Sequence, residues 1–380
     1  MLTSPFADIK VVDLSSYIAG ALCPGLLADL GAPVIKVESL TGDPFRSLGP
    51  TFQDWNRGKR SICVDLKSEE GRGVLYSLVE DADVVVENYR PGVARRLGAD
   101  YETLSRINPR LIYCSVSAYG QEGPYRSKPG FDPLLQARSG AMAFQGGASR
   151  PPVFLVLAIS DYGAACLGAY GVSLGLLARA RTGRGRKIET SLLRACMATQ
   201  SGRYVVVRSG PNGAREADYI GESPGYRLYR TADGWIFLGV KSEDEWKALN
   251  RALGREAPDA SNGSSSDEAL SRALARIFAS APSSDWISRL ERERVPCSPV
   301  QQVSDLLDDL QMKRNGLTVD YHSPDLGPVT LRGTPVMFSK TPGVSEKAAP
   351  SLGQHTDEVL GEVGYSEQEI LGLRSCKAVG

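Results

Sequence analysis

Histidine is scarce in this chain of 380 residues, which contains only His322 and His355. A Ser-His-Asp triad, a Cys-His pair or a histidine-based metal site would need one of these two side chains in the right place. The scarcity therefore favours chemistry by a carboxylate or by a cofactor. We interpret His355 as structural, because its segment LGQHTDE precedes a helix expected over residues 358–374, which Thr356 or a neighbour would cap.

An excess of charge and long hydrophobic runs are also missing. Lys+Arg and Asp+Glu both number 44. This balance argues against a protein that binds nucleic acids or membrane surfaces, because such proteins usually carry a basic excess. No stretch approaches about 18 uninterrupted apolar residues, so no membrane span is expected. The start, MLTSPFADIK, lacks the features of a signal peptide. Seven scattered cysteines without a C-x-x-C pair fit a reducing compartment, and we expect a cytoplasmic protein.

Short apolar segments alternate with helical ones over the first two hundred residues. The expected strands are residues 9–14, 33–37, 61–66, 83–87 and 111–117. Helical periodicity lies between them, as at residues 19–30 and 70–80. This alternation is typical of βαβ units and a parallel sheet. It predicts an α/β fold with a doubly wound, Rossmann-like sheet.

The residue pattern changes at about residue 205. Residues 1–205 carry the alternating pattern of a large Rossmann-like domain, and the turn-rich residues 206–225 are typical of a linker. Residues 226–330 indicate a smaller α+β domain. Residues 331–380 are expected to form a second linker and a C-terminal helix that returns to the large domain.

The smaller domain is expected to begin with a β-hairpin. Its strands are predicted at residues 226–230 and 235–240, around an A-D-G turn. Helices are predicted at residues 243–253 and 267–279, with a polar loop at 259–266 between them. This order of elements indicates an α+β arrangement.

A helix predicted over residues 161–181 is rich in glycine and alanine, which implies that another backbone packs closely against it. Asp161 stands at its start. As an N-cap, this residue would stabilise the helix by roughly 1 kcal/mol. As a nucleophile, it would stand beside a thin, glycine-lined wall that an acyl thioester can approach. The residues alone favour the N-cap interpretation.

Asp132 also resembles an N-cap, and Gln136 lies one turn further along the same helix face. Both side chains are candidates for assisting at a reactive carbonyl. A purely structural role explains the same spacing.

Basic and polar residues follow several predicted strands. The first βα junction, residues 13–20, lacks the G-x-G-x-x-G fingerprint, and its helix N-terminus is a candidate phosphate site or a plain turn. Three cations at residues 57–60 precede one strand. Since strand ends of parallel sheets open into the ligand crevice, Lys67, Arg90 and Arg96 are expected to converge on phosphates there. A solvated basic face is an equally good interpretation.

Eight segments occur in a fixed order from residue 9 to about residue 365. They are LLADLGAPVIKVE, WNRGKRS with VDLK, VENYRPG with RR, CSVSAYGQEGPYR, GFDPLLQARSG, ISDYG, ARARTGRGRKIETSLL and SLGQHTDEVL. Together they resemble the class III CoA-transferase family, which includes formyl-CoA transferases, carnitine CoA-transferases and 2-methylacyl-CoA racemases. The resemblance implies a ring-like subunit, with a large and a small domain joined by two linkers, and an interlocked homodimer.

By this resemblance, Asp161 is the nucleophile, Asp132 lies beside the reacting acyl group, and Phe131 and Gln136 lie near the substrate. The implied coenzyme A contacts are Ile18, Ala19, Val64, Asp65, Leu66, Lys67, Asn88, Tyr89, Arg90 and Arg96. The implied reaction moves CoA from an acyl-CoA to a small carboxylic acid through an aspartyl anhydride and an aspartyl-CoA thioester. CoA is then a substrate, and neither a metal nor a permanently bound cofactor is expected.

The sequence departs from the family pattern at two places. Racemases carry a histidine in a G-H-D segment where this chain has Phe131, and a phenyl ring cannot carry a proton. Formyl-CoA-type transferases carry a run of glycines where this chain has only IGESPG at residues 220–225, which argues against a glycine lid and a formyl or oxalyl substrate. Transfer within one dicarboxyl-CoA, racemisation and a non-catalytic CoA-binding role remain alternatives, and the intact Asp161 argues against the last.

Overall fold

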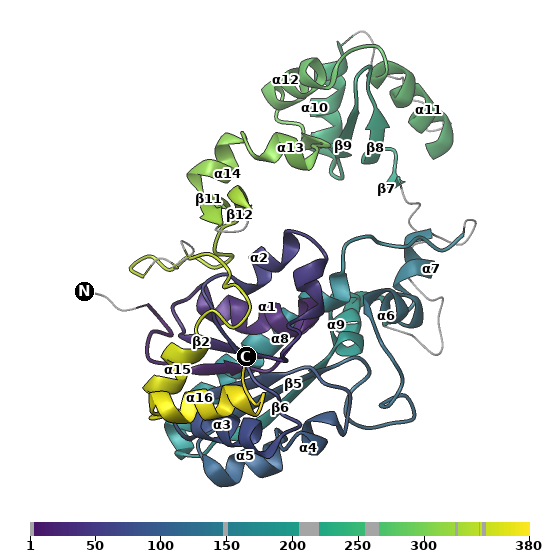
Figure 1. Cartoon of the computed structure of the whole chain (residues 1–380). Helices are drawn as coiled ribbons and strands as arrows, with labels where there is room; N and C mark the ends of the chain where they lie inside the picture. Colours follow the sequence, from purple (N-terminus) through teal and green to yellow (C-terminus); the bar gives the residue numbers. More distant parts are fainter. Residues whose placement is uncertain are drawn as a thin grey trace. The chain divides into compact units, whose positions relative to one another are not determined.

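A computed structural model describes residues 4–146, 151–204, 220–254, 266–323, 326–341, 343 and 347–380 (Figure 1). The chain divides into two compact units. The large unit comprises Met1–Ser139, Leu155–Val205 and Leu310–Gly380, and the small unit comprises Gly140–Phe154 and Val206–Asp309.

The large unit is built on a six-stranded parallel sheet, which confirms the predicted α/β class. Its strands are β1 (Val11–Asp13), β2 (Val34–Glu38), β3 (Arg60–Cys63), β4 (Val84–Glu87), β5 (Ile112–Ser117) and β6 (Arg186–Ser191), in the order β3-β2-β1-β4-β5-β6. The first five match the expected strands, whereas β6 was not predicted. The strand order reverses between β1 and β4, and in such sheets ligands bind at the carboxyl ends of the strands beside this reversal.

Helices cover both faces of this sheet, because alternate residues of each strand point to opposite sides. Val84 and Val86 of β4 pack with α1 (Tyr17–Ala28), α8 (Ile159–Thr182) and α9 (Leu192–Thr199), whereas Val85 packs with the helices of the other face. Those helices are α3 (Glu69–Glu80), α5 (Tyr101–Ile107), α15 (Thr356–Glu362) and α16 (Glu367–Ser375). The strands are therefore apolar on both sides, as the sequence indicated.

The glycines of α8 allow it to lie unusually close to its neighbours, as predicted. A Cβ atom at Gly168 would come within 2.9 Å of the Cys23 sulfur of α1, and one at Gly171 would come within 2.8 Å of the Ile188 side chain of β6. Within the described part of the chain, α8 is also the one helix long and apolar enough to cross a membrane by length and composition. Its packing against α1, α9, β5 and β6 is that of a core helix.

The C-terminal residues return to the large unit. Instead of the single expected helix at 358–374, two helices form, because the chain turns at Gly364, whose φ is +97°. The last residues then pair with the chain beyond β3, since Asp65 N donates to Ala378 O (2.8 Å) and Gly380 N donates to Cys63 O (3.1 Å).

The boundary expected at residue 330 differs from the observed division. The hairpin of β11 (Thr318–Ser323) and β12 (Gly327–Arg332), with α14 (Leu310–Arg314), belongs to the large unit. Its side chains reach helix residues of that unit, since Tyr321 Oη donates to Gln53 Oε1 (2.9 Å) and Arg332 Nε donates to Asp54 Oδ2 (3.0 Å). Conversely, residues 140–154, which include α7 (Ala141–Gly146), group with the small unit.

The small unit contains an antiparallel sheet covered by helices. Its strands are β7 (Gly221–Ser223), β8 (Tyr226–Arg230), β9 (Trp235–Gly239) and β10 (Cys297–Pro299), and its helices are α10 (Glu243–Leu253), α11 (Asp267–Phe278), α12 (Ser283–Arg292) and α13 (Val303–Leu306). The predicted β8–β9 hairpin is confirmed, and Trp286 and Phe278 lie in the core beneath it. Residues 206–219 of the expected linker and most of the expected polar loop, residues 259–265, lie outside the described residues.

Candidate active site

Asp161 is the third residue of α8, which begins at Ile159 and has Ala158 at its N-cap position. The N-cap interpretation of Asp161 is therefore wrong, because the helix starts two residues earlier than predicted. Burial, together with the neighbouring Asp132 carboxylate, raises the pKa of Asp161 to about 7. Within the described residues, no cation and no hydrogen-bond donor acts on the Asp161 carboxylate to lower its pKa again.

Asp132, by contrast, is tied into its surroundings. It is the first residue of α6 (Asp132–Arg138), and Phe131 occupies the N-cap position that the sequence assigned to Asp132. Its Oδ1 accepts from Ser160 N (2.8 Å) and from the Ser160 hydroxyl, and its Oδ2 accepts from Gln136 Nε2, as the one-turn spacing predicted. Asp132 therefore fixes the residue that precedes Asp161.

Gln136 extends this network to the chain that leads into α8. Its Nε2 donates to Leu155 O (3.0 Å) and Leu157 O (3.2 Å), and its Oε1 accepts from Leu155 N (3.2 Å). The side chain is fully buried. We conclude that Gln136 supports the backbone beside Asp161.

Further contacts connect α6 to the first βα turn. The rings of Phe131 and Tyr17 lie 6.4 Å apart, and Tyr17 begins α1 with a φ of +60°. Next to it, Ser16 N donates to Asn88 Oδ1 (3.0 Å), and Asn88 Nδ2 donates to Ser16 O (2.7 Å). These contacts bring Ile18 and Asn88, which were predicted to contact CoA, to the same end of the sheet as Asp161.

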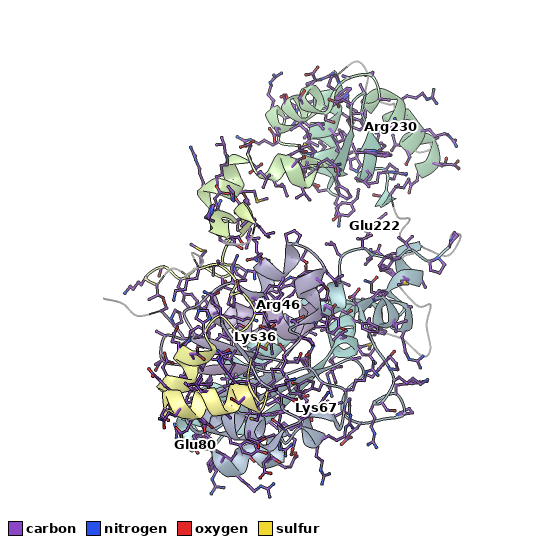
Figure 2. All side chains as sticks on the ribbon, in the orientation of Figure 1. Lys36, Arg46, Lys67, Glu80, Glu222 and Arg230 are labelled. Carbon is purple, nitrogen blue, oxygen red and sulfur yellow. The ribbon has the colours of Figure 1, made fainter. Side chains whose placement is uncertain are left out.

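A buried set of charges supports the first βα turn, and Figure 2 labels one of its members, Lys36. Lys59 Nζ lies 2.8 Å from Asp13 Oδ2, and Lys36 Nζ donates to Ser15 O (2.8 Å) and lies 3.0 Å from Asp43 Oδ2. Burial lowers the pKa of Lys59 to about 8, although Asp13 opposes this shift. Burial raises the pKa of Asp13, but Lys59 and Lys36 outweigh burial, so that its pKa is lowered.

The cations at residues 57–60 are therefore not a solvated basic face or a phosphate site. Arg57 is buried against Asp29, with its Nε 2.8 Å from Oδ1. Arg60 is partly exposed and pairs with Glu358 and Glu362 of the C-terminal helix. The sequence showed the charges, but their carboxylate partners lie up to about three hundred residues away in the chain, and spacing alone does not reveal such pairs.

The residues predicted to contact CoA follow β1, β3 and β4. Lys67, Arg90 and Arg96 are exposed, whereas Val64 and Leu66 are buried and pack in the core. The role of all the predicted residues in CoA binding stays a prediction. The remaining predicted contacts are Ala19, which is buried, and Ile18, Asp65, Asn88 and Tyr89, which are partly buried.

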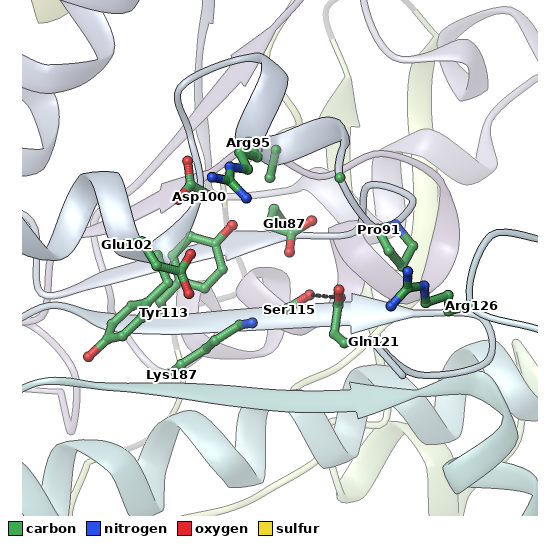
Figure 3. A pocket seen from close by; sticks show the side chains of 13 residues that line it. Glu87, Pro91, Arg95, Asp100, Glu102, Tyr113, Ser115, Gln121, Arg126 and Lys187 are labelled. Atoms are coloured by element: carbon green, nitrogen blue, oxygen red, sulfur yellow. Dashed lines mark hydrogen bonds between the residues drawn. The ribbon is translucent and has the colours of Figure 1, made fainter. Parts of the chain in front are cut away.

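A polar cavity of about 330 Å³ lies beside the segment that follows β4 (Figure 3). Glu87, Tyr113 and Lys187 come from strands β4, β5 and β6, and Arg95 and Arg126 approach from loops and α4 (Val93–Arg96). Burial raises the pKa of Glu87. This cavity was not predicted from the sequence, since Lys187 on one side of it belongs to β6, a strand that lacks an apolar signal. In the part of the chain that the structure describes, no group of three or more His, Cys, Asp or Glu side chains is placed to hold a metal ion.

Comparison with known proteins decides the family. The model of the family described as CoA-transferase family III matches residues 6–356. The chain belongs to CoA-transferase family III. It is 33% identical to succinyl-CoA:glutarate CoA-transferase of Mus musculus, over 99% of this chain and 90% of that protein. It is also 33% identical to succinyl-CoA:mesaconate CoA-transferase of Haloarcula hispanica, over 94% of this chain and 96% of that protein.

A solved structure supports the same assignment. A CaiB/BaiF family protein from Brucella suis superposes with a TM-score of 0.84 at 31% identity, over 95% of this chain and all of that one. The family III assignment therefore rests on sequence and fold across nearly the whole chain. It confirms that this protein is a family III CoA-transferase, and that CoA thioesters and carboxylic acids are its kind of substrate.

The pKa of Asp161 predicts a pH dependence for this CoA-transferase. By the resemblance Asp161 is the nucleophile, and a nucleophilic carboxylate must be ionised, so this role predicts that kcat/KM falls about tenfold per pH unit below pH 7. A carboxyl whose folded pKa is raised binds a proton more tightly in the folded state, so its contribution to stability is lost as pH rises from about 4 to about 7. Activity profiles and unfolding temperatures from pH 5 to pH 9 measure both effects.

Asp132→Asn provides the matched control for this prediction. Removing the neighbouring negative charge is expected to shift the acidic limb of kcat/KM to lower pH, because Asp132 contributes to the raised pKa of Asp161. An unchanged acidic limb of kcat/KM in Asp132→Asn would show that a group other than Asp161 controls the pH dependence.

Proposed function

We propose that this protein moves CoA from an acyl-CoA thioester to a carboxylic acid through covalent intermediates on Asp161. One observation supports this role above all others. Asp161 lies in a shielded position without a cation or donor in the described residues, while the neighbouring Asp132 is fully engaged. A carboxylate kept from water and from partners is available for attack on a thioester carbon.

In the first half of the reaction, an oxygen of Asp161 attacks the thioester carbon of the donor and the C–S bond breaks. An acyl-aspartyl anhydride and CoA thiolate result. The thiolate then attacks the aspartyl carbonyl, and the anhydride C–O bond breaks. The donor acid leaves as a carboxylate, and an aspartyl-CoA thioester remains.

In the second half, the carboxylate of the acceptor attacks the aspartyl-CoA thioester and releases the thiolate again. The thiolate attacks the acceptor carbonyl of the new anhydride, which yields acceptor-CoA and the free Asp161 carboxylate. Each step exchanges one activated acyl bond for another, so no external energy source is required. The Asp132–Gln136–Ser160 network keeps the start of α8 in place through these exchanges.

The proposed CoA site lies at the ends of β1, β3 and β4. Exposed Lys67, Arg90 and Arg96 are suited to the phosphates of CoA, because their charges are not buried in ion pairs. Ile18 adjoins Tyr17, whose ring contacts Phe131, and Asn88 holds Ser16 in the same turn, so both are suited to the thioester end. The remaining predicted contacts, Ala19, Val64, Asp65, Leu66 and Tyr89, belong to the same turns.

We propose an interlocked homodimer as the functional assembly, in the cytoplasm. α8 carries an exposed apolar stripe of Tyr170, Leu174 and Leu177, which are 63%, 46% and 53% exposed. Such a stripe on a core helix is typical of a surface covered by another subunit. Light scattering at micromolar concentration is expected to give twice the mass of the chain.

A product assay separates the candidate reactions. Succinyl-CoA with glutarate or mesaconate, the substrates in the names of the relatives, provides the first donor and acceptors. Formation of a second acyl-CoA only when a free acid is added supports transfer between molecules. An isomeric CoA ester formed from a dicarboxyl-CoA alone would indicate transfer within one molecule.

Racemisation is the second enzyme class to test. Phe131 stands where the racemases of the family carry histidine, so deuterium from heavy water is not expected to enter the 2-position of a methylacyl-CoA. Deuterium incorporation without any transfer to a free acid would overturn the proposed function.

A further inference from the structure

The side chain of Lys59 is completely buried beside the first βα turn, residues 14–16. Its Nζ donates to Asp13 Oδ2 (2.8 Å), Ala21 O (2.7 Å) and Asn56 Oδ1 (2.9 Å). These acceptors belong to the end of β1, to α1 and to the end of α2 (Thr51–Asn56). The Lys59 ammonium is therefore the common partner of three elements that meet at this turn.

The hydrogen bonds of Lys59 require its charged form. An ammonium group has three N–H donors and a neutral amine has two, whereas all three partners accept. Asp13 offers a carboxylate oxygen, and Ala21 offers a backbone carbonyl. The Asn56 amide also presents its oxygen, because its Nδ2 donates to Phe52 O (3.1 Å). Loss of the proton would leave one of these buried acceptors without a donor.

Four charged or titratable side chains face Lys59 from the surrounding elements. They are Asp13 of β1, Cys23 of α1, Lys36 of β2 and Asp43. Burial lowers the pKa of Lys59, Asp13 opposes this shift and Lys36 adds to it, so that the pKa is about 8. Burial also lowers the pKa of Lys36, but Asp13 and Asp43 outweigh burial and raise it. A contact with Cys114, together with burial, raises the pKa of Cys23 well above its ordinary value.

Asp13 connects Lys59 to the first βα turn. Its Oδ2 accepts from Lys59, and its Oδ1 accepts from Ser15 N (2.9 Å) and from the Ser15 hydroxyl. The next residue, Ser16, exchanges two hydrogen bonds with the Asn88 side chain, which follows β4. The strand order reverses between β1 and β4, so this turn borders the crevice in which such sheets bind ligands.

Close packing leaves α1 little freedom to move at this crevice. A Cβ atom at Gly20 would lie 2.6 Å from Asn88 Cγ, and one at Gly25 would lie 2.8 Å from Trp55 O of α2. Both glycines therefore allow approaches that no other residue would permit. A small displacement of α1 relative to either neighbour would change the shape of the turn.

We propose that Lys59 is a positioning residue for CoA transfer, whose ammonium group holds the first βα turn in the shape that binds CoA. This inference rests on the proposed CoA site at the ends of β1, β3 and β4, and it adds the group that fixes one side of that site. Lys59 acts through Asp13 and Ser15 and does not touch the substrate. Loss of its proton loosens the turn, and CoA then binds more weakly.

Titration calorimetry of the wild-type protein with CoA from pH 7 to pH 9 is the first test. The Kd is expected to rise about tenfold per pH unit above pH 8, because only the fraction with protonated Lys59 is competent to bind. Lys10→Met is the matched control, since Lys10 is an exposed lysine of the same unit that pairs with Asp81. It should reproduce the wild-type curve. A wild-type Kd that stays constant over this range would overturn the inference.

Two variants assign the pH dependence to Lys59. Lys59→Met has a side chain of similar length without a donor, so its Kd for CoA at pH 7 is expected to be about tenfold above the wild-type value and to change little up to pH 9. Lys59→Arg stays charged throughout, so its Kd should also be the same at pH 7 and pH 9. An alkaline rise that persists in both variants would show that another group causes it, and would overturn the inference.

Thermal unfolding separates this role from a loss of stability. The pKa of Lys59 is about 8 in the folded protein and 10.5 as its ordinary value, so its contribution to stability rises as pH increases between these values. CoA binding should therefore weaken from pH 8 to pH 9 without a fall of the unfolding temperature relative to Lys59→Arg. Affinities that only follow the unfolding temperatures would overturn the inference. The expected curves without covalent labelling of Asp161 would overturn the proposed nucleophile and leave this inference intact.

Discussion

Replacement of Asp161 by alanine is expected to lower kcat by about 10⁴-fold or more, because the variant has no group on which the proposed covalent intermediates can form. The Kd for CoA is expected to change less than about threefold, since the proposed phosphate contacts Lys67, Arg90 and Arg96 lie on other elements. Steady-state kinetics and isothermal titration with CoA measure the two quantities. Asp161→Asn should behave in the same way, because a neutral amide is also a poor nucleophile.

Asp357→Ala is the matched control for these variants. Asp357 is an exposed carboxylate of α15 whose partner is Arg374 on the neighbouring helix. Surface pairs of this kind contribute little to stability, so turnover should remain within about twofold of the wild type. A kcat of Asp161→Ala within tenfold of the wild-type value would show that Asp161 is not the nucleophile.

Replacement of Asp13 by alanine is expected to lower the free energy of unfolding of the large unit by about 3–5 kcal/mol. Asp13 is fully buried, and its carboxylate lies 2.8 Å from Lys59 Nζ and 4.0 Å from Lys36 Nζ. Its removal leaves two buried ammonium groups with one fewer counter-charge. The reduced unfolding temperature should be accompanied by lost activity, because Lys36 also holds Ser15 in the first βα turn.

The control for this variant is Asp81→Ala, which removes an exposed carboxylate that pairs with Lys10. Its effect on the unfolding temperature should be small, since exposed pairs are worth less than about 1 kcal/mol. Equal shifts of the unfolding temperature in Asp13→Ala and Asp81→Ala would contradict the stabilising role assigned to the buried charges.

Local sequence pattern was sufficient to predict most of the sheet. Runs such as Val84, Val85 and Val86 are apolar on both faces of a parallel sheet, and this property is visible without knowledge of the neighbouring strands. The glycines of α8 likewise indicated close packing. By contrast, β6 (Arg186–Ser191) has largely exposed residues because it lies at the edge of the sheet, and its sequence lacks an apolar signal.

The residues of the candidate site could be predicted from the sequence, but their surroundings in the fold could not. Asp132 and Gln136 were expected on one helix face, and their hydrogen bond confirms the spacing. The helix starts were misplaced, so Asp161 and Asp132 were taken for N-caps. The ring contacts of Tyr17 with Phe45 and Phe131 were not predicted, since these residues are far apart in the chain and meet only after folding.

The central claim is that a covalent bond forms between the acyl group, or CoA, and Asp161. Protein incubated with acyl-CoA, quenched with hydroxylamine and digested should yield one peptide that carries a hydroxamate at Asp161. Borohydride should reduce the same side chain to an alcohol when the thioester is present. Modification of another residue, or an unmodified Asp161 in protein that is turning over substrate, would contradict the account.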